Sequence, residues 1–352
     1  MQKKRLPTRD YRCARRNTFP LLHSDALSLN SRSMDDPRPA SIHSLVRHNI
    51  GPAQPVKARP TRIDRGMRPE DAFRATLSDC LTQMTANAAT LRAGRSVEGL
   101  HQLRVALRRL EVALKAFGEE FRQEWLGDLR GRAKILSSRL GPARDLDVFL
   151  TQLLDVPAEE GDREAFAALR TRMEEMRGKA WKQANECVTG SDFMLFAEDI
   201  AALIHSRLPL APDTRLDHVA KRMLKRQQQR AVKRGKKAKS CEEGDLHRLR
   251  IALKKLRYTA EFLAPLYPKK KVRRYVGKLR GLQEHLGAIN DIAHVRTTMH
   301  TLLRETDGKR VLPGERYAAG VVAGWYRARR PQIAKKALKR WKRFRKVKPF
   351  WA

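Results

Sequence analysis

Apolar residues recur at intervals of three and four from Arg68 onward, and the strict apolar–polar alternation of β-strands is essentially missing. Because this period matches the turn of an α-helix, the pattern predicts an all-α fold. Pro209 and Pro212 make the clearest internal break, so we expect two halves, 66–209 and 210–352. The expected helices span 68–93, 97–117, 121–140, 145–154, 161–187, 191–206, 214–234, 243–264, 269–286, 290–304, 311–328 and 331–346.

Two motifs occur twice with the same offset. The segment HQLRVALRRL, residues 101–110, returns as HRLRIALKKL at 247–256, with six of ten positions identical. The pattern Leu-x3-Leu-Gly-x3-Asp ends at Asp145 and again at Asp291, which is the same shift of 146 residues. A shared offset indicates a tandem helical repeat. We therefore predict that the two halves bury a shared apolar interface and that their equivalent positions face each other across a pseudo-two-fold axis.

A helical wheel of the repeated segment separates an apolar face from a cationic face. The residues that we expect to pack are Leu100, Leu103, Leu107, Leu110, Leu114 and Phe117, and in the second copy Leu249, Leu253, Leu256 and Leu263. The opposite side carries His101, Arg104, Arg108 and Lys115, and in the second copy His247, Arg250 and Lys254. Arg109 and Lys255 flank this stripe and Arg257 widens it, while Glu261 stands where the repeat would place the counterpart of Lys115.

Like charges at helical spacing repel one another, and a bound anion would remove that repulsion. Arginine offers a planar fork of donors that suits phosphate oxygens, lysine adds a mobile charge, and protonated histidine donates from both nitrogens. The stripe is therefore interpreted as a phosphate cradle. A single basic stripe is more often a solvated helix face. Its duplication, with the histidine in register, favours the cradle.

The paired histidines His101 and His247 are expected to be neutral in the empty site, because arginine neighbours oppose a further positive charge. A bound phosphate would favour the charged form, so affinity should weaken as the pH rises through neutrality. The other eight histidines are assigned structural roles. Asp145 and Asp291 are expected to cap helices or to hold arginines rather than to act in catalysis.

The charge of the chain points to a polyanionic partner. The 352 residues contain 75 Lys+Arg and 38 Asp+Glu, which gives a net charge of +37. Residues 327–352 hold 12 Lys+Arg and no acid. A charge of this size must be screened or bound by something anionic. The terminal helix could lie on nucleic acid or on an anionic membrane, or it could pack its aromatic residues onto the bundle, and we favour packing.

The first 65 residues differ from the rest, with 14 Lys+Arg, 5 acids and no helical period. We predict a disordered basic leader. A transit peptide, or a translation start at Met67, would also fit this composition. No apolar run is long enough for a membrane span, and the four cysteines form no Cys-x-x-Cys pair. These features predict a cytoplasmic protein without metal or cofactor.

The two motifs, with Arg144-Asp145-x-Asp147-Val148 after Leu140-Gly141 and a terminal Pro349-Phe350-Trp351, resemble the conserved histidine α-helical domain (CHAD) family over about 66–350. The resemblance implies two pseudo-symmetric bundles of antiparallel helices around a central basic cavity that binds inorganic polyphosphate, and association with polyphosphate granules in some members. The binding residues that it implies are His101, Arg104, Arg108, Arg109, His247, Arg250, Lys254, Lys255 and Arg257, to which the stripe adds Lys115 and the following helices add Arg132, Arg139, Lys278 and Arg280.

Two other classes of function are weighed against polyphosphate binding. A nucleic-acid binder would fit the pI of about 10.9, but aromatic residues make up only 6% of the chain, which leaves few stacking platforms beyond Tyr258. An enzyme acting on phosphate chains normally needs a metal held by carboxylates or a phosphate-binding loop, and the sequence has neither signature. The Glu-x-Glu-x-Lys signature of the CYTH triphosphatase, which accompanies many relatives, is also missing. The sequence therefore predicts a non-enzymatic polyphosphate-binding protein, with nucleic-acid binding as the alternative.

Overall fold

The computed structural model describes residues 54–157, 159–206, 215–304 and 310–352, and these residues form helices and no strand. The predicted all-α fold is confirmed. In the first half the helices are α2 (Pro69–Ala93), α3 (Val97–Phe121), α4 (Leu126–Arg139), α5 (Gly141–Val148), α6 (Arg163–Thr189) and α7 (Ser191–His205). In the second half they are α8 (Leu216–Lys237), α9 (Glu243–Phe262), α10 (Lys269–Leu302) and α11 (Pro313–Phe344).

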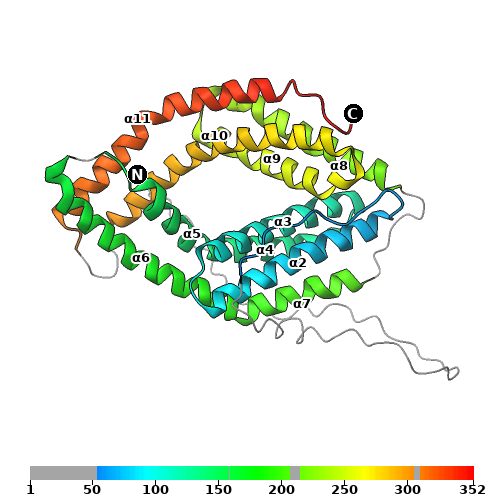
Figure 1. The fold of residues 1–352 in the computed structure, drawn as a ribbon, viewed down its shortest axis with the longest axis horizontal. Helices are drawn as coiled ribbons and strands as arrows, with labels where there is room; N and C mark the ends of the chain where they lie inside the picture. The colour runs from blue at the N-terminus through cyan, green and yellow to red at the C-terminus, as the bar shows by residue number, and fades with distance from the viewer. Residues whose placement is uncertain (1–53, 158, 207–214, 305–309) are drawn as a thin grey trace, which may run out of the picture. The chain divides into compact units, whose positions relative to one another are not determined.

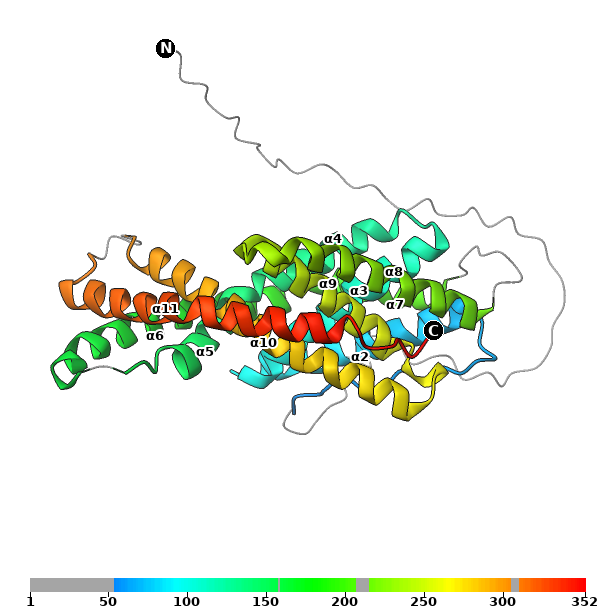
Figure 2. The ribbon, with the colours of Figure 1, turned by 90° about the horizontal axis from the view of Figure 1, so that it is seen from above.

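Four short elements connect or extend these helices: a π-helix at Phe149–Leu153 and 3₁₀ turns at Glu160–Asp162, Ala238–Ser240 and Ala264–Leu266. Within the first half α3 packs between α2 and α4, and within the second half α9 packs between α8 and α10. Among the described residues, the main contacts between the halves lie where α2 and α3 meet α8 and α9, and where α6 meets α11 (Figure 1, Figure 2).

The apolar face predicted for the repeated segment forms the core. All ten of its apolar residues are at most 1% exposed. Helix α3 begins at the side-chain cap of Ser96, whose Oγ accepts a hydrogen bond from the Gly99 amide at 3.1 Å. The structure places the two copies of the segment on equivalent helices, α3 and α9, and the pseudo-two-fold relation between the halves stays a prediction.

Two predicted helix breaks do not occur. Helix α10 runs through Gly287, where a break was expected by analogy with Gly141. The first half does break, because Pro142 opens α5 there, whereas Ala288 keeps its amide hydrogen and continues the helix. Helix α11 likewise continues through the exposed Pro331. Asp145 and Asp291 consequently lie inside helices and not at their starts.

The described part of the chain includes residues that precede the predicted boundary at residue 65. Residues 54–64 form no helix, but Thr61 and Ile63 are buried. The backbone of Val56 exchanges two hydrogen bonds with the side-chain amide of Asn87, at 3.0 and 2.8 Å. The remainder of the predicted leader, 1–53, and the break at 207–214 lie outside the described residues.

The C-terminal segment packs its aromatic residues inward, as favoured from the sequence. Trp341, Phe344, Phe350 and Trp351 are all at most 7% exposed, and Tyr275 contacts three of their rings. None of the described helices has both the length and the apolar content needed to cross a membrane.

Candidate anion-binding site

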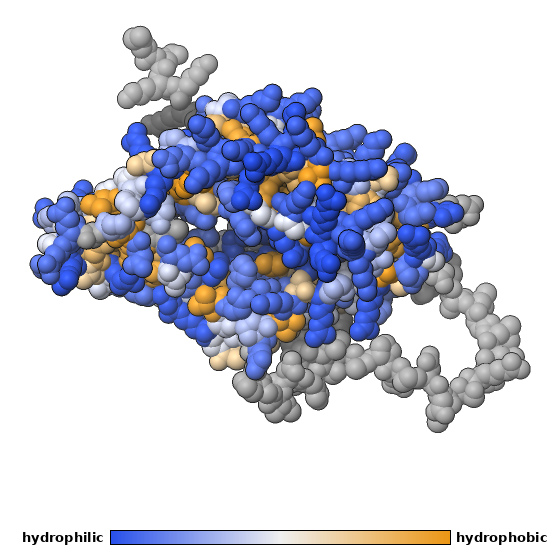
Figure 3. Space-filling view, turned by 45° about the horizontal axis from the view of Figure 1, so that its top comes forward, coloured by the Kyte–Doolittle hydropathy of each residue, from blue (hydrophilic) through white to orange (hydrophobic). Residues whose placement is uncertain are grey.

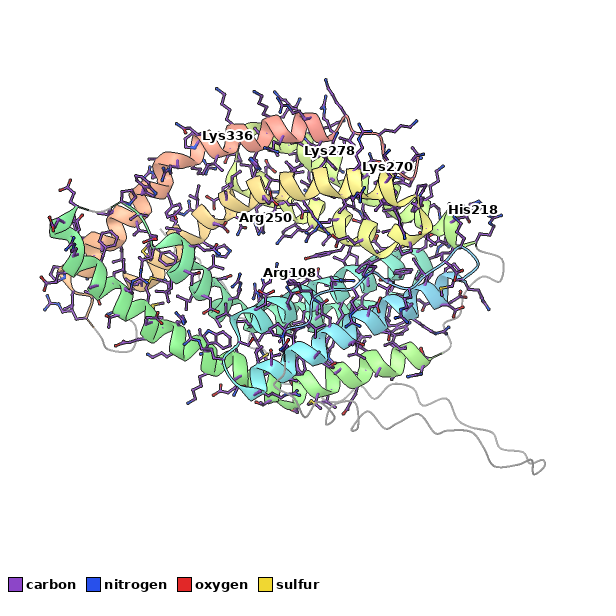
Figure 4. The ribbon with its side chains drawn as sticks, viewed as in Figure 1. Arg108, His218, Arg250, Lys270, Lys278 and Lys336 are labelled. Carbon is purple, nitrogen blue, oxygen red and sulfur yellow. The ribbon has the colours of Figure 1, made fainter. Side chains whose placement is uncertain are left out.

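A cavity of about 390 Å³ opens between the two halves, and four helices line it. Helices α3 and α5 contribute from the first half and α9 and α10 from the second. In Figure 4, Arg108 of α3 and Arg250 of α9 reach into this space from opposite sides. The space-filling view shows a hollow between the halves bordered largely by hydrophilic residues (Figure 3). The cationic stripes of both copies therefore face a shared concavity.

The first half contributes His101, Arg104, Arg108 and Arg144. Arg104 donates from Nη1 to the Ser137 carbonyl oxygen at 2.8 Å, which holds its guanidinium against the end of α4. A side chain at Gly141 would place its Cβ 3.0 Å from the same Nη1. The glycine in the repeated motif therefore provides the room that Arg104 needs to reach the cavity.

The second half contributes His247, Arg250 and Lys254 of α9, with Asn290 and His294 of α10. The His247 Nδ1 lies 3.0 Å from the Asn290 Oδ1, and Arg250 donates to that same oxygen at 3.4 Å. One amide oxygen thus orients both side chains. Asn290 stands 146 residues after Arg144, so the two halves use different residues at equivalent positions.

Burial and mutual repulsion disfavour the charged forms of the cavity residues. Burial, followed by the charge of Arg108, lowers the pKa of Lys254 from 10.5 to about 6. The same two causes lower the pKa of Arg104 to about 10 and lower that of Arg250. Burial and then Arg144 lower the pKa of His101. The cavity therefore holds more positive charge than its own carboxylates balance. The lowering of the His101 pKa has the direction expected for a neutral imidazole, and the neutral form stays a prediction.

Several cation donors also lack partners. The Nε atoms of Arg104, Arg250 and Arg257 are buried, and within the described chain they have no hydrogen-bond partner. A buried donor without a partner costs free energy. An anion with several acceptor oxygens would supply what these groups lack.

Two carboxylates share the cavity with the cations. Asp145 and Asp291 come from opposite halves, and the Asp145 Oδ2 lies 3.9 Å from the His294 Nδ1. Burial raises the pKa of Asp291, while Arg250 acts in the opposite direction. The expectation that these aspartates hold basic side chains agrees with this placement, whereas the alternative of helix capping is wrong because both lie within helices.

Six of the residues assigned to binding line this cavity: His101, Arg104, Arg108, His247, Arg250 and Lys254. Arg257 does not line it but adjoins Lys254 electrostatically. Its guanidinium lies 4.9 Å from the ring centre of Tyr258, which is itself buried.

The remaining predicted residues lie elsewhere. Arg109 is only 4% exposed, and its guanidinium lies 5.2 Å from the ring centre of Phe262. It follows Arg108 by one residue on α3, so it points to a different side of the helix and lies in the core. Lys115 and Lys255 lie near carboxylates of α3, with Nζ–O distances of 3.6 Å to Glu119 and 3.9 Å to Glu111.

Four residues assigned from the following helices hold the fold together or face outward. Arg132 pairs with Asp199, Arg139 with Asp192 at 2.8 Å and Arg280 with Glu261 at 2.9 Å, so each guanidinium links two helices. Lys278 is exposed and projects from α10 away from the cavity (Figure 4). The structure does not bring these four to the cavity.

Sequence reasoning did not assign Arg144, Asn290 and His294 to binding, although all three line the cavity. The available signal was positional, because Arg144 and Asn290 immediately precede the two repeated aspartates. His294 gave no comparable signal, since its repeat counterpart is Val148.

Comparison with known proteins agrees with this architecture. The CHAD domain model matches residues 75–300. The crystal structure of the CHAD domain from the plant Ricinus communis has a TM-score of 0.71 and 25% identity, covering 81% of this chain and 96% of that one. PptA from Streptomyces chartreusis has a TM-score of 0.61 and 20% identity, covering 81% and 100%. No curated protein sequence matches. Because the family model spans more than half of the chain, the protein belongs to the CHAD family.

Proposed function

We propose that the cavity binds inorganic polyphosphate. The observation that carries this proposal is the convergence of five lysine and arginine side chains from both halves on one cavity that contains only two carboxylates. The family to which the chain belongs is associated with polyphosphate. Phosphate oxygens would accept from the unpaired guanidinium donors and would restore the charged form of Lys254.

The arrangement suits a chain of phosphates better than a single phosphate. Arg104 and Arg108 approach from α3, and Arg250 and Lys254 approach from α9 on the other side. An unbranched polyphosphate carries charge at every internal unit and exposes oxygens all around its axis. A chain lying between the two helices would therefore meet donors on both sides.

Nucleic acid is the second candidate, and the lining of the cavity weighs against it. Apart from three histidines, Phe149 is the one aromatic side chain among the described residues that line it, and it is 1% exposed. Tyr258, the aromatic residue nearest in sequence to the basic stripe, is 3% exposed. Neither can stack on a base. The cavity would then bind a nucleic acid mainly through its phosphate groups, and polyphosphate offers phosphate groups without the bulky bases.

Competition binding tests the proposal. A labelled long polyphosphate is bound to the full chain and challenged with unlabelled polyphosphate, DNA and RNA at equal phosphate concentration and fixed salt. We expect unlabelled polyphosphate to displace the label at far lower concentration than either nucleic acid. Equal displacement by DNA or RNA would refute polyphosphate selectivity.

A charge-reversal variant locates the binding. The Arg104→Glu/Arg250→Glu variant should lose binding while keeping its helical circular dichroism signal. Its matched control is Lys134→Glu/Lys182→Glu, because these two exposed lysines carry the same charge change away from the cavity. If both variants lost affinity equally, the overall charge and not the cavity would hold the polymer.

We also propose that binding is not coupled to a reaction. In support, the described residues contain no group of three or more His, Cys, Asp and Glu side chains arranged to hold a metal. Incubation with polyphosphate and Mg²⁺ should leave the chain length unchanged and release no phosphate, as measured by gel electrophoresis and a phosphate assay.

The proposed location follows from the ligand. A protein that binds polyphosphate without consuming it would gather where the polymer is stored, so we propose a cytoplasmic protein that associates with polyphosphate granules. A fluorescent fusion should overlap with granules, and the Arg104→Glu/Arg250→Glu variant should be diffuse.

A further inference from the structure

The outer face of α11 and the segment after it carry a second concentration of positive charge. Residues 327–352 contain 12 Lys+Arg and no acid, and among the described residues none of these cations is within ion-pair distance of a carboxylate. Eleven of the twelve are exposed and the other, Arg330, is half-buried. This contrasts with Arg132, Arg139 and Arg280, which are all paired. The charge of this face is therefore not neutralised within the fold.

A notch of about 440 Å³ is cut into this face where the end of α8 meets α11. Lys239 approaches from the 3₁₀ turn after α8, and Lys342, Arg345 and Lys346 approach from the end of α11. The lining residues include no acid. Four cations from two segments thus surround one concave site, separate from the residues of the cavity.

The floor of the notch is rigid and apolar. Trp341, at its base, is 4% exposed and packs against α8 so closely that a Cβ on Gly235 would lie 2.0 Å from the indole ring. The glycine therefore fixes how near α8 and α11 approach, and with it the spacing of Lys239 from the cations of α11. The floor holds the cations in place and offers no exposed ring of its own.

We propose that this notch (Lys239, Lys342, Arg345 and Lys346) is a second site for a phosphate chain, so that one long polyphosphate engages the notch and the cavity of the same molecule. The inference rests on the proposed function of the cavity. The notch supplies point charges and guanidinium forks, which suit closely spaced phosphate oxygens.

The exposed chemistry of this face favours an inorganic chain over the other polyanions. The aromatic residues of the segment, Trp341, Phe344, Phe350 and Trp351, are buried, so they offer neither a stacking platform for bases nor an apolar wedge for a bilayer. Leu338, the aliphatic residue of the notch, is half-buried. The exposed side chains that line the notch are therefore all charged: Lys239, Lys342, Arg345 and Lys346.

Two sites on one molecule have a measurable consequence. A chain long enough to span both binds the second site as an intramolecular step, which multiplies its affinity without new contacts. Tripolyphosphate can occupy only one site at a time. Affinity per molecule of ligand should therefore rise between tripolyphosphate and long-chain polyphosphate by more than the number of available phosphates explains.

The test compares two ligands on three forms of the full chain: wild type, the notch variant Lys239→Gln/Lys342→Gln/Lys346→Gln, and the control Lys134→Gln/Lys182→Gln/Lys221→Gln, which removes three exposed lysines elsewhere. The notch variant should lose at least tenfold in affinity for long-chain polyphosphate. Its affinity for tripolyphosphate should change less than twofold, and the control should match wild type for both ligands. Melting temperatures verify that all three forms are folded.

The salt dependence provides a second readout. The slope of log affinity against log salt for the long chain should become shallower in the notch variant by about 2, because each lost phosphate contact removes roughly 0.7 to 0.9. An unchanged slope and an unchanged long-chain affinity would overturn the inference.

The cavity variant separates this inference from the proposed function. In Arg104→Glu/Arg250→Glu, tripolyphosphate should bind only weakly, through the notch, and long-chain polyphosphate should bind more weakly than to the wild type, and the notch substitutions should remove what remains for both ligands. If tripolyphosphate bound the cavity variant normally, the proposed function would fail. If the remaining binding preferred duplex DNA or anionic vesicles over polyphosphate, the notch would be a site for those ligands and the inference would fail.

Discussion

Replacing Lys254 with methionine should stabilise the empty protein and weaken its binding of polyphosphate. Lys254 is half-buried, and burial with the charges of Arg108 and Arg250 lowers its pKa to about 6. An unfolded chain would return the amine to its ordinary pKa of 10.5. Methionine keeps the apolar stem of the side chain and removes the amine, so the variant isolates the cost of holding this group among arginines.

The size of the expected gain in stability follows from the lowered pKa of Lys254. Holding such an amine neutral at pH 7 costs at most about 5 kcal/mol at 1.36 kcal/mol for each pKa unit. Because Lys254 is only half-buried, solvent screening reduces this bound, and we expect a gain of roughly 2 kcal/mol. For a domain of about 290 residues, with an unfolding entropy of about 2.1 cal/mol/K per residue, that gain raises the melting temperature by roughly 3 °C. Binding should weaken tenfold or more, because a hydrogen bond to a charged group contributes about 1.5 to 3 kcal/mol.

The same pKa difference determines how the stability gain of Lys254→Met varies with pH. Between the folded pKa of about 6 and the unfolded pKa of 10.5, the unfolded state binds one proton more at this lysine than the folded state does. The stability of the wild type therefore rises with pH over this window relative to the variant. The advantage of Lys254→Met should be largest below pH 6 and should shrink as the pH approaches 10.

Thermal unfolding with and without polyphosphate measures both properties, and Lys255→Met is the matched control. Lys255 does not line the cavity, and its Nζ lies 3.9 Å from the Glu111 carboxylate. We expect the control to keep its affinity and to gain less stability than Lys254→Met, because burial also lowers the pKa of Lys255 but the Glu111 carboxylate opposes that shift. The reasoning would be refuted if Lys254→Met lowered the melting temperature, or if it bound polyphosphate as tightly as the wild type.

Three further predictions concern binding and packing. Affinity for polyphosphate should fall as the pH rises from 6 to 8, because a bound anion raises the lowered pKa values of Lys254 and His101, so that the protein takes up protons on binding. Isothermal titration calorimetry in buffers of different ionisation enthalpy should detect this uptake. Binding that does not depend on pH would contradict the prediction. Gly235→Ala should destabilise the protein by about 1 to 3 kcal/mol in urea unfolding, because its new methyl group meets the Trp341 ring; an unchanged midpoint would show that the ring has room to move. Asp147→Ala should cost about 3 to 5 kcal/mol, because it removes the acceptor of the Trp181 indole N–H, at 3.1 Å, and the buried ion-pair partner of Arg177, at 3.2 Å; stability equal to wild type would argue that water replaces the carboxylate.

The period of the sequence predicted which faces of α3 and α9 are buried and which carry the cavity cations. The period could not decide which of two neighbouring residues at the edge of that face is buried and which reaches the cavity. Arg109 follows Arg108 by one residue, a rotation of about 100°, and this is enough to place one guanidinium in the core and the other in the cavity.

The pattern of apolar and polar residues could not predict contacts between helices that are distant in sequence. Nothing local to Arg132 or Arg139 indicates that α7 supplies the carboxylates Asp199 and Asp192. The helix breaks depend on single residues in the same way. Pro142 interrupts the first half, while its repeat counterpart Ala288 allows α10 to continue, and a shared motif could not distinguish the two outcomes without weighing that one substitution.

The differences between the two halves bear on the kind of ligand that the cavity can hold. Arg144 in the first half corresponds to Asn290 in the second, and Arg108 corresponds to Lys254, so the donors on the two sides are not equivalent. A compact ligand with fixed two-fold symmetry would meet mismatched donors at one of its ends. An unbranched chain of like units can shift along its axis until its oxygens meet the donors that are present, so it loses little affinity when the halves diverge. The unequal lining therefore favours a polymeric anion over a small symmetric one.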